Sequence, residues 1–131
     1  MDDAFGNWLA GFIDGEGYFG IFTNDGRYIC AFAVGLHPCE RPVLDGLLER
    51  TGLGTIHTQA RMVRWQIRAR GDCVGLIELL DRYPLRSRKA ADYALWREAV
   101  LSREAGAPQG DLADLASALR SGRPRRGPVP A

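Results

Sequence analysis

The chain has 131 residues, of which 46% are hydrophobic and 25% charged, and its formal net charge is +1 at pH 7. These proportions are typical of a soluble globular protein with one domain and a core of ordinary size. No apolar run approaches the roughly 18 residues of a membrane span, and no basic segment precedes a short apolar one as in a secretory signal. We therefore expect a cytoplasmic or otherwise intracellular protein with no membrane partner. The cysteines Cys30, Cys39 and Cys73 are odd in number and lack the spacing of metal ligands, so we expect free thiols.

Basic residues are grouped along the chain rather than spread evenly. Four arginines fall within ten residues without an acidic residue among them, and four more crowd the C-terminal segment. The first group is Arg61, Arg64, Arg68 and Arg70, and the second is Arg120, Arg123, Arg125 and Arg126. Such groups indicate a surface for nucleic acid more clearly than the net charge does.

The most informative segment is Leu9–Gly17, which has an apolar start and ends in two acids set among glycines. The apolar start predicts a buried helix. Gly11 and Gly15 share one helical face and allow another backbone to approach closely, although each glycine costs the helix about 1 kcal/mol. Asp14 and Glu16 fall at the helix C-terminus, where the macrodipole disfavours negative charge and a bound cation would explain them. Taken alone, the segment is better explained as a buried helix that ends in a glycine turn with two solvated acids.

The first half of the chain reads as a helix, a hairpin and a second helix. In the returning strand of the hairpin the even positions are bulky and apolar, so the odd positions form a flatter opposite face. Pro42 suits the first turn of a helix, and Gly52 its end. The expected elements are a helix capped by Asp2 or Asp3 and running to about Asp14, strands at 18–23 and 27–36 joined by a turn at 24–26, and a helix that ends at Gly52.

The second half contains the clearest strand pattern, at 62–70. Apolar residues at odd positions alternate there with Arg64, Gln66, Arg68 and Arg70. Alone, this pattern fits a half-buried strand with a solvated basic face as well as it fits a nucleic-acid surface. The expected elements are strands at 55–60 and 62–70, a helix capped by Asp72 and ended before Pro84, a helix capped by Ser87, a linker at 104–110, an amphipathic helix at 111–120, and a basic disordered tail at 122–131.

Leu9–Gly17 resembles the signature of the LAGLIDADG homing endonuclease family. Six of its nine positions match letter for letter, and Phe12, Gly15 and Glu16 replace residues of similar size or charge. The order of elements is similar to the αββαββα core of that family, and 85–89 is similar to its basic turn. The resemblance implies an α+β fold in which helices back an antiparallel four-stranded saddle sheet. It implies an endonuclease domain at 1–103, a linker and C-terminal helix at 104–121, and the tail at 122–131.

The family's members carry one such motif or two, and only one is found here. The segment of the chain most similar to the motif, at 74–81, lacks the small residue, the acid and the glycine that the chemistry requires. A single motif implies a homodimer in which two copies of the first helix meet. The expected interface residues are Trp8, Leu9, Gly11, Phe12, Asp14 and Gly15.

The resemblance also implies the chemistry: site-specific, divalent-metal-dependent cleavage of both strands of a long, near-palindromic DNA target. Glu16 and the Gly15 carbonyl would bind Mg²⁺, Mn²⁺ would substitute for it, and Ca²⁺ would bind without cleavage. Arg86, or Lys89 as the alternative, would stabilise transition-state charge. Leu36 stands where the family often has a polar, water-organising residue, and either His37 fills that role or it is structurally idle. No small-molecule substrate is expected.

Double-stranded DNA would lie against the face formed by the two hairpins. Arginine and glutamine pair with base edges, and small apolar residues contact thymine methyl groups. The expected DNA-binding residues are Arg27, Ile29, Ala31, Ala33, Thr55, His57, Gln59, Arg61, Arg64, Gln66, Arg68 and Arg70. Arg68 and Arg70 are expected to reach phosphates. The alternatives are a non-cleaving DNA-binding regulator or RNA-splicing maturase on the same fold, and an unrelated α+β domain with a basic sheet.

Overall fold

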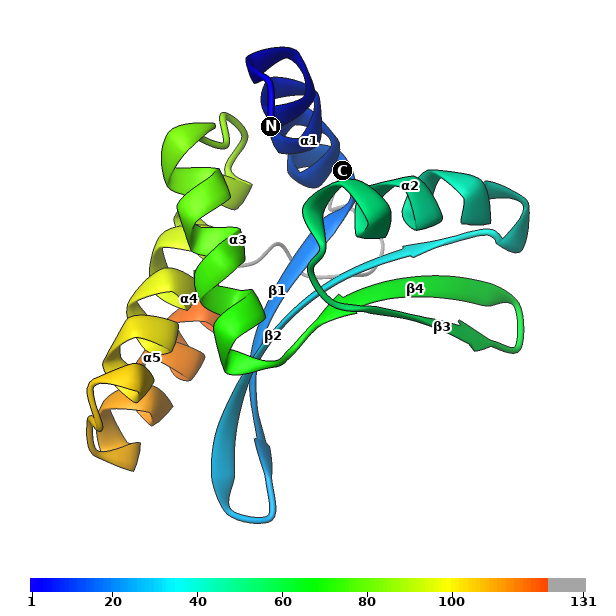
Figure 1. Cartoon of the computed structure of the whole chain (residues 1–131). Helices are drawn as coiled ribbons and strands as arrows, with labels where there is room; N and C mark the ends of the chain where they lie inside the picture. The colour runs from blue at the N-terminus through cyan, green and yellow to red at the C-terminus, as the bar shows by residue number, and fades with distance from the viewer. Residues whose placement is uncertain (123–131) are drawn as a thin grey trace, which may run out of the picture.

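The computed structural model describes residues 1–122, which form five α-helices, one 3-10 helix and one four-stranded sheet (Figure 1). The order of elements is the expected one, and the α+β class is confirmed. The expected tail lies outside the described residues, except for Gly122, which ends the last helix. The elements are α1 (Asp3–Glu16), β1 (Gly17–Asn24), β2 (Arg27–Leu36), η1 (Pro38–Glu40), α2 (Arg41–Thr51), β3 (Thr55–Gln59), β4 (Met62–Ile67), α3 (Arg70–Arg82), α4 (Lys89–Glu104) and α5 (Gln109–Gly122).

The sheet is antiparallel throughout, with strand order β1-β2-β4-β3. A two-residue turn closes the first hairpin, with φ of 51° at Asp25 and 74° at Gly26. Two successive residues with positive φ are typical of a type I′ turn, whose twist suits a β-hairpin. This turn fixes the register of β1 on β2, so that Asn24 pairs with Arg27 and every odd residue of β2 faces an even residue of β1.

The two faces of the sheet differ in composition because side chains alternate along each strand. One face is bulky and apolar, and it packs into a single core with the helices. Its largest fully buried side chains are Trp65, Trp96, Phe19 and Phe32, each at most 1% exposed. In Figure 1 the helices gather on one side of the curved sheet, and the other face remains open.

The start of α1 and the end of α2 agree with the sequence expectation, whereas α1 continues to Glu16, two residues past its expected end. The Asp2 carboxylate accepts a hydrogen bond of 2.8 Å from the Phe5 N–H and caps α1. Gly52 ends α2 in a left-handed conformation with φ of 68°. A left-handed residue at this position satisfies a free carbonyl of the last helical turn, and glycine adopts it without a steric penalty.

The start of α3 and the cap of α4 correct the sequence expectation. Strand β4 ends at Ile67, and Arg70 opens α3. Asp72 is not the cap: it lies inside α3, and its carboxylate accepts a hydrogen bond of 3.0 Å from the Gly54 N–H. The residue that precedes α4 is Arg88, which makes no side-chain capping bond, and the expected cap Ser87 lies one residue earlier; the Ser87 hydroxyl accepts a hydrogen bond of 3.2 Å from the Lys89 N–H.

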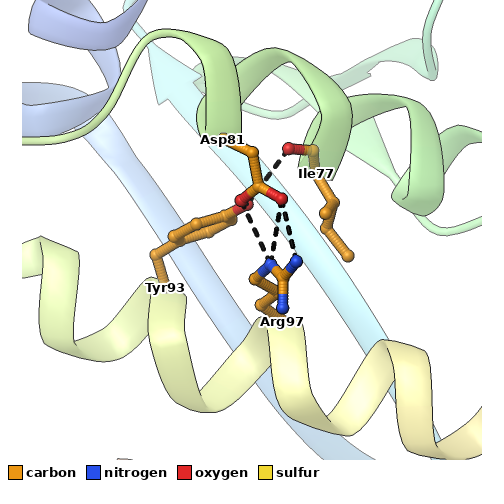
Figure 2. Close-up of polar contacts among 4 residues, drawn as sticks. All are labelled: Ile77, Asp81, Tyr93 and Arg97. Carbon is orange, nitrogen blue, oxygen red and sulfur yellow. Dashed lines mark hydrogen bonds and ion pairs between the residues drawn. The ribbon is translucent and has the colours of Figure 1, made fainter.

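Helices α3 and α4 are joined by a polar network shown in Figure 2. Arg97 on α4 donates to both carboxylate oxygens of Asp81 on α3, and the shortest contact is 2.9 Å. The Tyr93 hydroxyl lies 2.8 Å from Asp81 Oδ1 and 3.2 Å from the Ile77 carbonyl oxygen. Helix α5 packs on α4 and β1, and its Leu112, Ala116 and Leu119 belong to the same core.

Candidate functional site

One side of α1 is buried in the protein and the other is open. Ile13 is fully buried, whereas Trp8 is 50% exposed. A Cβ built at Gly11 or Gly15 would meet no atom within 4 Å. We call Trp8, Gly11, Phe12 and Gly15 the open face of α1. It combines an exposed indole, stacked on the Phe12 ring at 5.2 Å between centroids, with two positions where a second backbone can approach.

The placement of α1 corrects two expectations. The apolar sequence predicted a helix that is buried on all sides, but one side of α1 is exposed. Leu9 was expected in a dimer interface, but it is 1% exposed and belongs to the protein's own core. Asp14 was also expected there; its carboxylate contacts a turn of the same chain, and its place in an interface stays a prediction. The other expected interface residues form the open face of α1.

The Asp14 carboxylate accepts several hydrogen bonds from the Arg86–Ser87 turn. The Arg86 N–H lies 2.9 Å from Oδ2 and 3.1 Å from Oδ1, and the Ser87 N–H lies 3.0 Å from Oδ1. The Ser87 hydroxyl donates to Oδ1 over 2.7 Å. Burial alone would raise the pKa of Asp14, but the hydrogen bonds from Ser87 and Arg86, helped by the charge of Lys89, lower it overall. The Asp14 carboxylate is therefore ionised, and it is engaged by hydrogen bonds within its own chain.

Glu16, two residues further on, is in the opposite situation. It is the last residue of α1 and is exposed. Across residues 1–122, no hydrogen bond or ion pair is made to its carboxylate. The structure thus separates the two acids that the sequence places together: Asp14 is engaged by its own chain, and Glu16 is available to a ligand.

The basic candidates Arg86 and Lys89 lie on the turn that Asp14 holds. Arg86 is exposed, and its backbone N–H contacts Asp14. Lys89 opens α4 and is half-buried, and its ammonium group lies close enough to Asp14 to contribute to the lowered pKa of that acid. Residues that are distant in the sequence, at 14–16 and 86–89, therefore meet at one end of α1. His37 caps η1 through a 3.1 Å hydrogen bond from the Cys39 N–H to its Nδ1, which favours the structural reading of this histidine.

The open face of the sheet carries the odd-numbered residues of β2 and the even-numbered residues of β4, as the alternation in the sequence predicted. The register places Gln66 beside Ala33 on one side and Thr55 on the other, and Arg64 beside His57. None of the residues on this face is acidic. In strand order they are Tyr18, Gly20, Phe22, Asn24, Arg27, Ile29, Ala31, Ala33, Gly35, Gln66, Arg64, Met62, Thr55, His57 and Gln59.

Two expected DNA contacts on this face have little surface to offer. Ala31 is 6% exposed and Ala33 is 5% exposed, so they form the floor of the face rather than projecting from it. Tyr18 and Phe22 project instead, with exposures of 47% and 40%. The sequence reading missed both, although the two-residue turn after Asn24 places the even residues of β1 beside the odd residues of β2.

The arginines around β4 are placed differently from one another. Arg68 follows β4 and lies over the Phe22 ring, 5.5 Å from its centroid. Arg61 is in the turn between β3 and β4. Arg70 is not a strand residue, because it opens α3 and lies 3.9 Å from Glu104 in an ion pair. A hollow of about 520 Å³ at the β3 edge is lined by Thr55, His57, Gln66 and Arg68, among other residues.

Among residues 1–122, no three metal-binding side chains of the His, Cys, Asp or Glu type converge. In the same part of the chain, no helix is both long and apolar enough to cross a membrane. Cys30 and Cys73 are buried, Cys39 is exposed, and all three are free thiols as expected.

Comparisons with known proteins identify the family of this arrangement. A family model described as LAGLIDADG endonuclease matches residues 9–100. A probable intron-encoded endonuclease 3 of Neurospora crassa is 35% identical over 104 residues, which are 71% of this chain and 20% of that protein. A probable intron-encoded endonuclease Cox1-I1b of Schizosaccharomyces pombe is 26% identical over 108 residues, which are 77% of this chain and 28% of that protein. The chain thus spans between a fifth and about a quarter of the length of these relatives.

Solved structures give the same result for the fold. The LAGLIDADG meganuclease I-AabMI, bound to uncleaved DNA, is 34% identical with a TM-score of 0.74, and the match covers 77% of this chain and 37% of that one. The homing endonuclease I-TnaI is 21% identical with a TM-score of 0.78, and the match covers 89% of this chain and 94% of that one. Motif, fold and the matched range of residues lead to one conclusion: the chain belongs to the LAGLIDADG endonuclease family.

Proposed function

We propose that this protein is a site-specific DNA endonuclease that works as a homodimer with a divalent metal ion and cuts both strands of a long, near-palindromic target. The observation that carries the proposal is the contrast between the two acids at the end of α1. Asp14 is occupied by the Arg86–Ser87 turn, and Glu16 is exposed and unpaired in the described chain. A carboxylate that no group of its own chain occupies is available to hold a cation.

The residues fit a magnesium site that is completed by other molecules. One protomer supplies the Glu16 carboxylate and the Gly15 carbonyl, which are hard oxygen donors, and among residues 1–122 they are not joined by a cluster of further metal-binding side chains. Mg²⁺ is commonly bound in this way, through one or two carboxylates together with substrate phosphates. A bound Mg²⁺ would offset the charge of the scissile phosphate and help to generate hydroxide near neutral pH. I-SmaMI, a neighbour in fold at 22% identity, is described as bound to its uncleaved target in the presence of calcium ions.

Dimerisation would supply the second acid. The open face of α1 ends at Gly15, directly before Glu16, so two copies packed along this face would bring both Glu16 residues near the two-fold axis. Without a cation, two adjacent carboxylates would repel each other. The exposed Trp8 indole supports such packing, because covering it with a second copy removes apolar surface from water.

The open face of the sheet would bind the DNA. Arg64 and Gln66 stand side by side on β4 and can each form two hydrogen bonds with a base edge. Tyr18, Phe22 and Ile29 add apolar surface that suits the thymine methyl group. The absence of acids from this face favours approach to a polyanion.

The test is a comparison of cleavage with binding on a target selected from a random DNA library. Wild-type protein should bind and cut both strands with Mg²⁺ or Mn²⁺, and should bind without cutting in Ca²⁺. Glu16→Gln keeps the shape of the side chain but removes its charge, so cleavage should fall by at least about 100-fold while binding persists. Binding by the wild type without cleavage in any of these metals would favour the regulator or maturase alternative.

A further inference from the structure

We propose that Asp14 is a positioning residue: its carboxylate holds the Arg86–Ser87 turn and thereby places the cations Arg86 and Lys89 beside Glu16. The inference rests on the proposed endonuclease function. It adds a second role to the one that the sequence predicts for Asp14 at a dimer interface.

Three donors converge on one half-buried carboxylate. Two consecutive backbone N–H groups and one hydroxyl reach Asp14, over distances of 2.7 to 3.1 Å. Hydrogen bonds to an ionised acceptor are the stronger kind, and two adjacent amides fix the orientation of the turn as well as its distance. The donors come from a segment more than seventy residues away in the sequence, so this contact joins the end of α1 directly to the start of α4.

The connection continues from Ser87 to Lys89. The Ser87 hydroxyl donates to Asp14 and accepts the Lys89 N–H over 3.2 Å. Lys89 therefore begins α4 at a point set by Asp14. The same ammonium group is near enough to stabilise the ionised carboxylate. Since Glu16 lies on the same helix end, the distance between the acid and the two cations depends on this turn.

Asparagine cannot replace the carboxylate in this role. Its oxygen can take the place of Oδ1 and keep the bonds from Ser87 and the 3.1 Å bond from the Arg86 N–H, but its NH₂ group would replace Oδ2, to which the same N–H now donates over 2.9 Å. Two donors that face each other repel, so the turn should shift. Displacement of a catalytic group by about 1 Å can lower a rate by about 100-fold.

The first experiment is a pair of double-mutant cycles in single-turnover cleavage, combining Asp14→Asn with Lys89→Ala and separately with Arg86→Ala. Asp14→Asn alone should slow cleavage by about 10- to 100-fold and change DNA affinity in Ca²⁺ by less than about threefold. In at least one cycle the double variant should be no more than about threefold slower than the slower single variant, because the two changes disable one group. Multiplicative losses in both cycles would overturn the proposal, since a purely structural role predicts them.

The second experiment uses the fact that Lys89 is the only lysine in the chain. Protein labelled with ¹⁵N-lysine gives one backbone amide signal, from the N–H that bonds to Ser87. Its hydrogen exchange should be at least about tenfold faster in Asp14→Asn and in Ser87→Ala than in the wild type. Asp114→Asn, an exposed acid on α5, is the matched control and should leave the rate unchanged. Wild-type exchange in Asp14→Asn would refute the proposed clamp.

The two readouts separate this inference from the proposed function. If the wild type cuts no DNA, the endonuclease proposal fails, and the amide exchange alone decides whether Asp14 holds the turn. If Asp14→Asn does not fold, Ser87→Ala replaces it in both cycles, because this variant removes one hydroxyl and leaves the backbone contacts with Asp14 in place.

Discussion

The strongest prediction about assembly concerns Trp8. A buried tryptophan contributes up to about 250 Å² of surface, so the exposed half of Trp8 offers at most about 125 Å² to a partner. At about 25 cal/mol per Å², covering this area stabilises each side of an interface by about 3 kcal/mol, or about 6 kcal/mol for a two-fold dimer. If only a third is covered, the gain is about 2 kcal/mol. Trp8→Ala should therefore weaken the dimer between about 30-fold and 10⁴-fold.

Sedimentation equilibrium over a wide range of protein concentrations measures this change directly. Leu101→Ala is the matched control, because Leu101 is an exposed apolar residue, at 37%, on α4 rather than on the open face of α1. It should leave the dimer constant unchanged. Gly11→Leu should also dissociate the dimer, by filling the space where a second backbone would approach. Circular dichroism of each variant checks that the fold is intact.

Two results would refute this reasoning. The first is a Trp8→Ala protein that dimerises with the wild-type constant, which would place the interface elsewhere. The second is a wild-type protein that stays monomeric at tens of micromolar and still cuts both strands, since one protomer offers one free acid at the end of α1.

Three further predictions concern the sheet, the metal and one turn. Arg64→Ala and Gln66→Ala should each relax the base preference at particular target positions, by about 1–3 kcal/mol. Arg68→Ala should instead weaken binding to all sites and make binding less dependent on salt. Binding selections measure these changes, and if all three variants affected every site equally, the prediction would be contradicted. With wild-type protein, Mn²⁺ should restore cleavage after chelation of Mg²⁺, whereas Ca²⁺ should leave the DNA bound and uncut, as plasmid cleavage beside gel shift would show. Gly54→Ala should destabilise the fold more than its control Gly52→Ala in urea unfolding. Both glycines have positive φ, but only at Gly54 would the new Cβ lie 2.4 Å from a backbone atom, the Gln66 carbonyl oxygen.

The features that local sequence determines were predicted well. Strand β2 was placed correctly because its alternation is long and a two-residue turn precedes it. Helix α2 was placed within a residue by Pro42 and Gly52, whose backbone preferences do not depend on distant partners. The alternation of apolar and polar residues in β2 and β4 also identified the open face of the sheet. The register of these strands is well determined, because a shift of one residue would expose the core side chains.

The errors lie where a distant part of the chain determines the outcome. Arg70 continues the alternation of β4 by chance, but it opens α3 and pairs with Glu104. Asp72 was predicted to cap α3, yet it bonds the Gly54 N–H, eighteen residues earlier. The same limitation applies at the site: sequence placed Asp14 and Glu16 together, and only the fold shows which of them the Arg86–Ser87 turn occupies.

Asp81 is a further case, and it leads to a prediction about acid stability. In the sequence it ends the segment that most resembles a second motif, and in the structure it joins α3 to α4 (Figure 2). The hydrogen bonds from Arg97 and Tyr93 outweigh partial burial and lower the pKa of Asp81. A carboxyl group whose pKa is lowered by folding stabilises the protein above its unfolded pKa, about 3.9, and this stabilisation is lost as the pH falls through the folded value. Asp81→Asn should therefore unfold at lower urea than the wild type at pH 7, by about 1 kcal/mol, and the difference should shrink below about pH 4. A difference that stays constant down to pH 2.5 would show that the ionised carboxylate does not stabilise the pairing of α3 with α4.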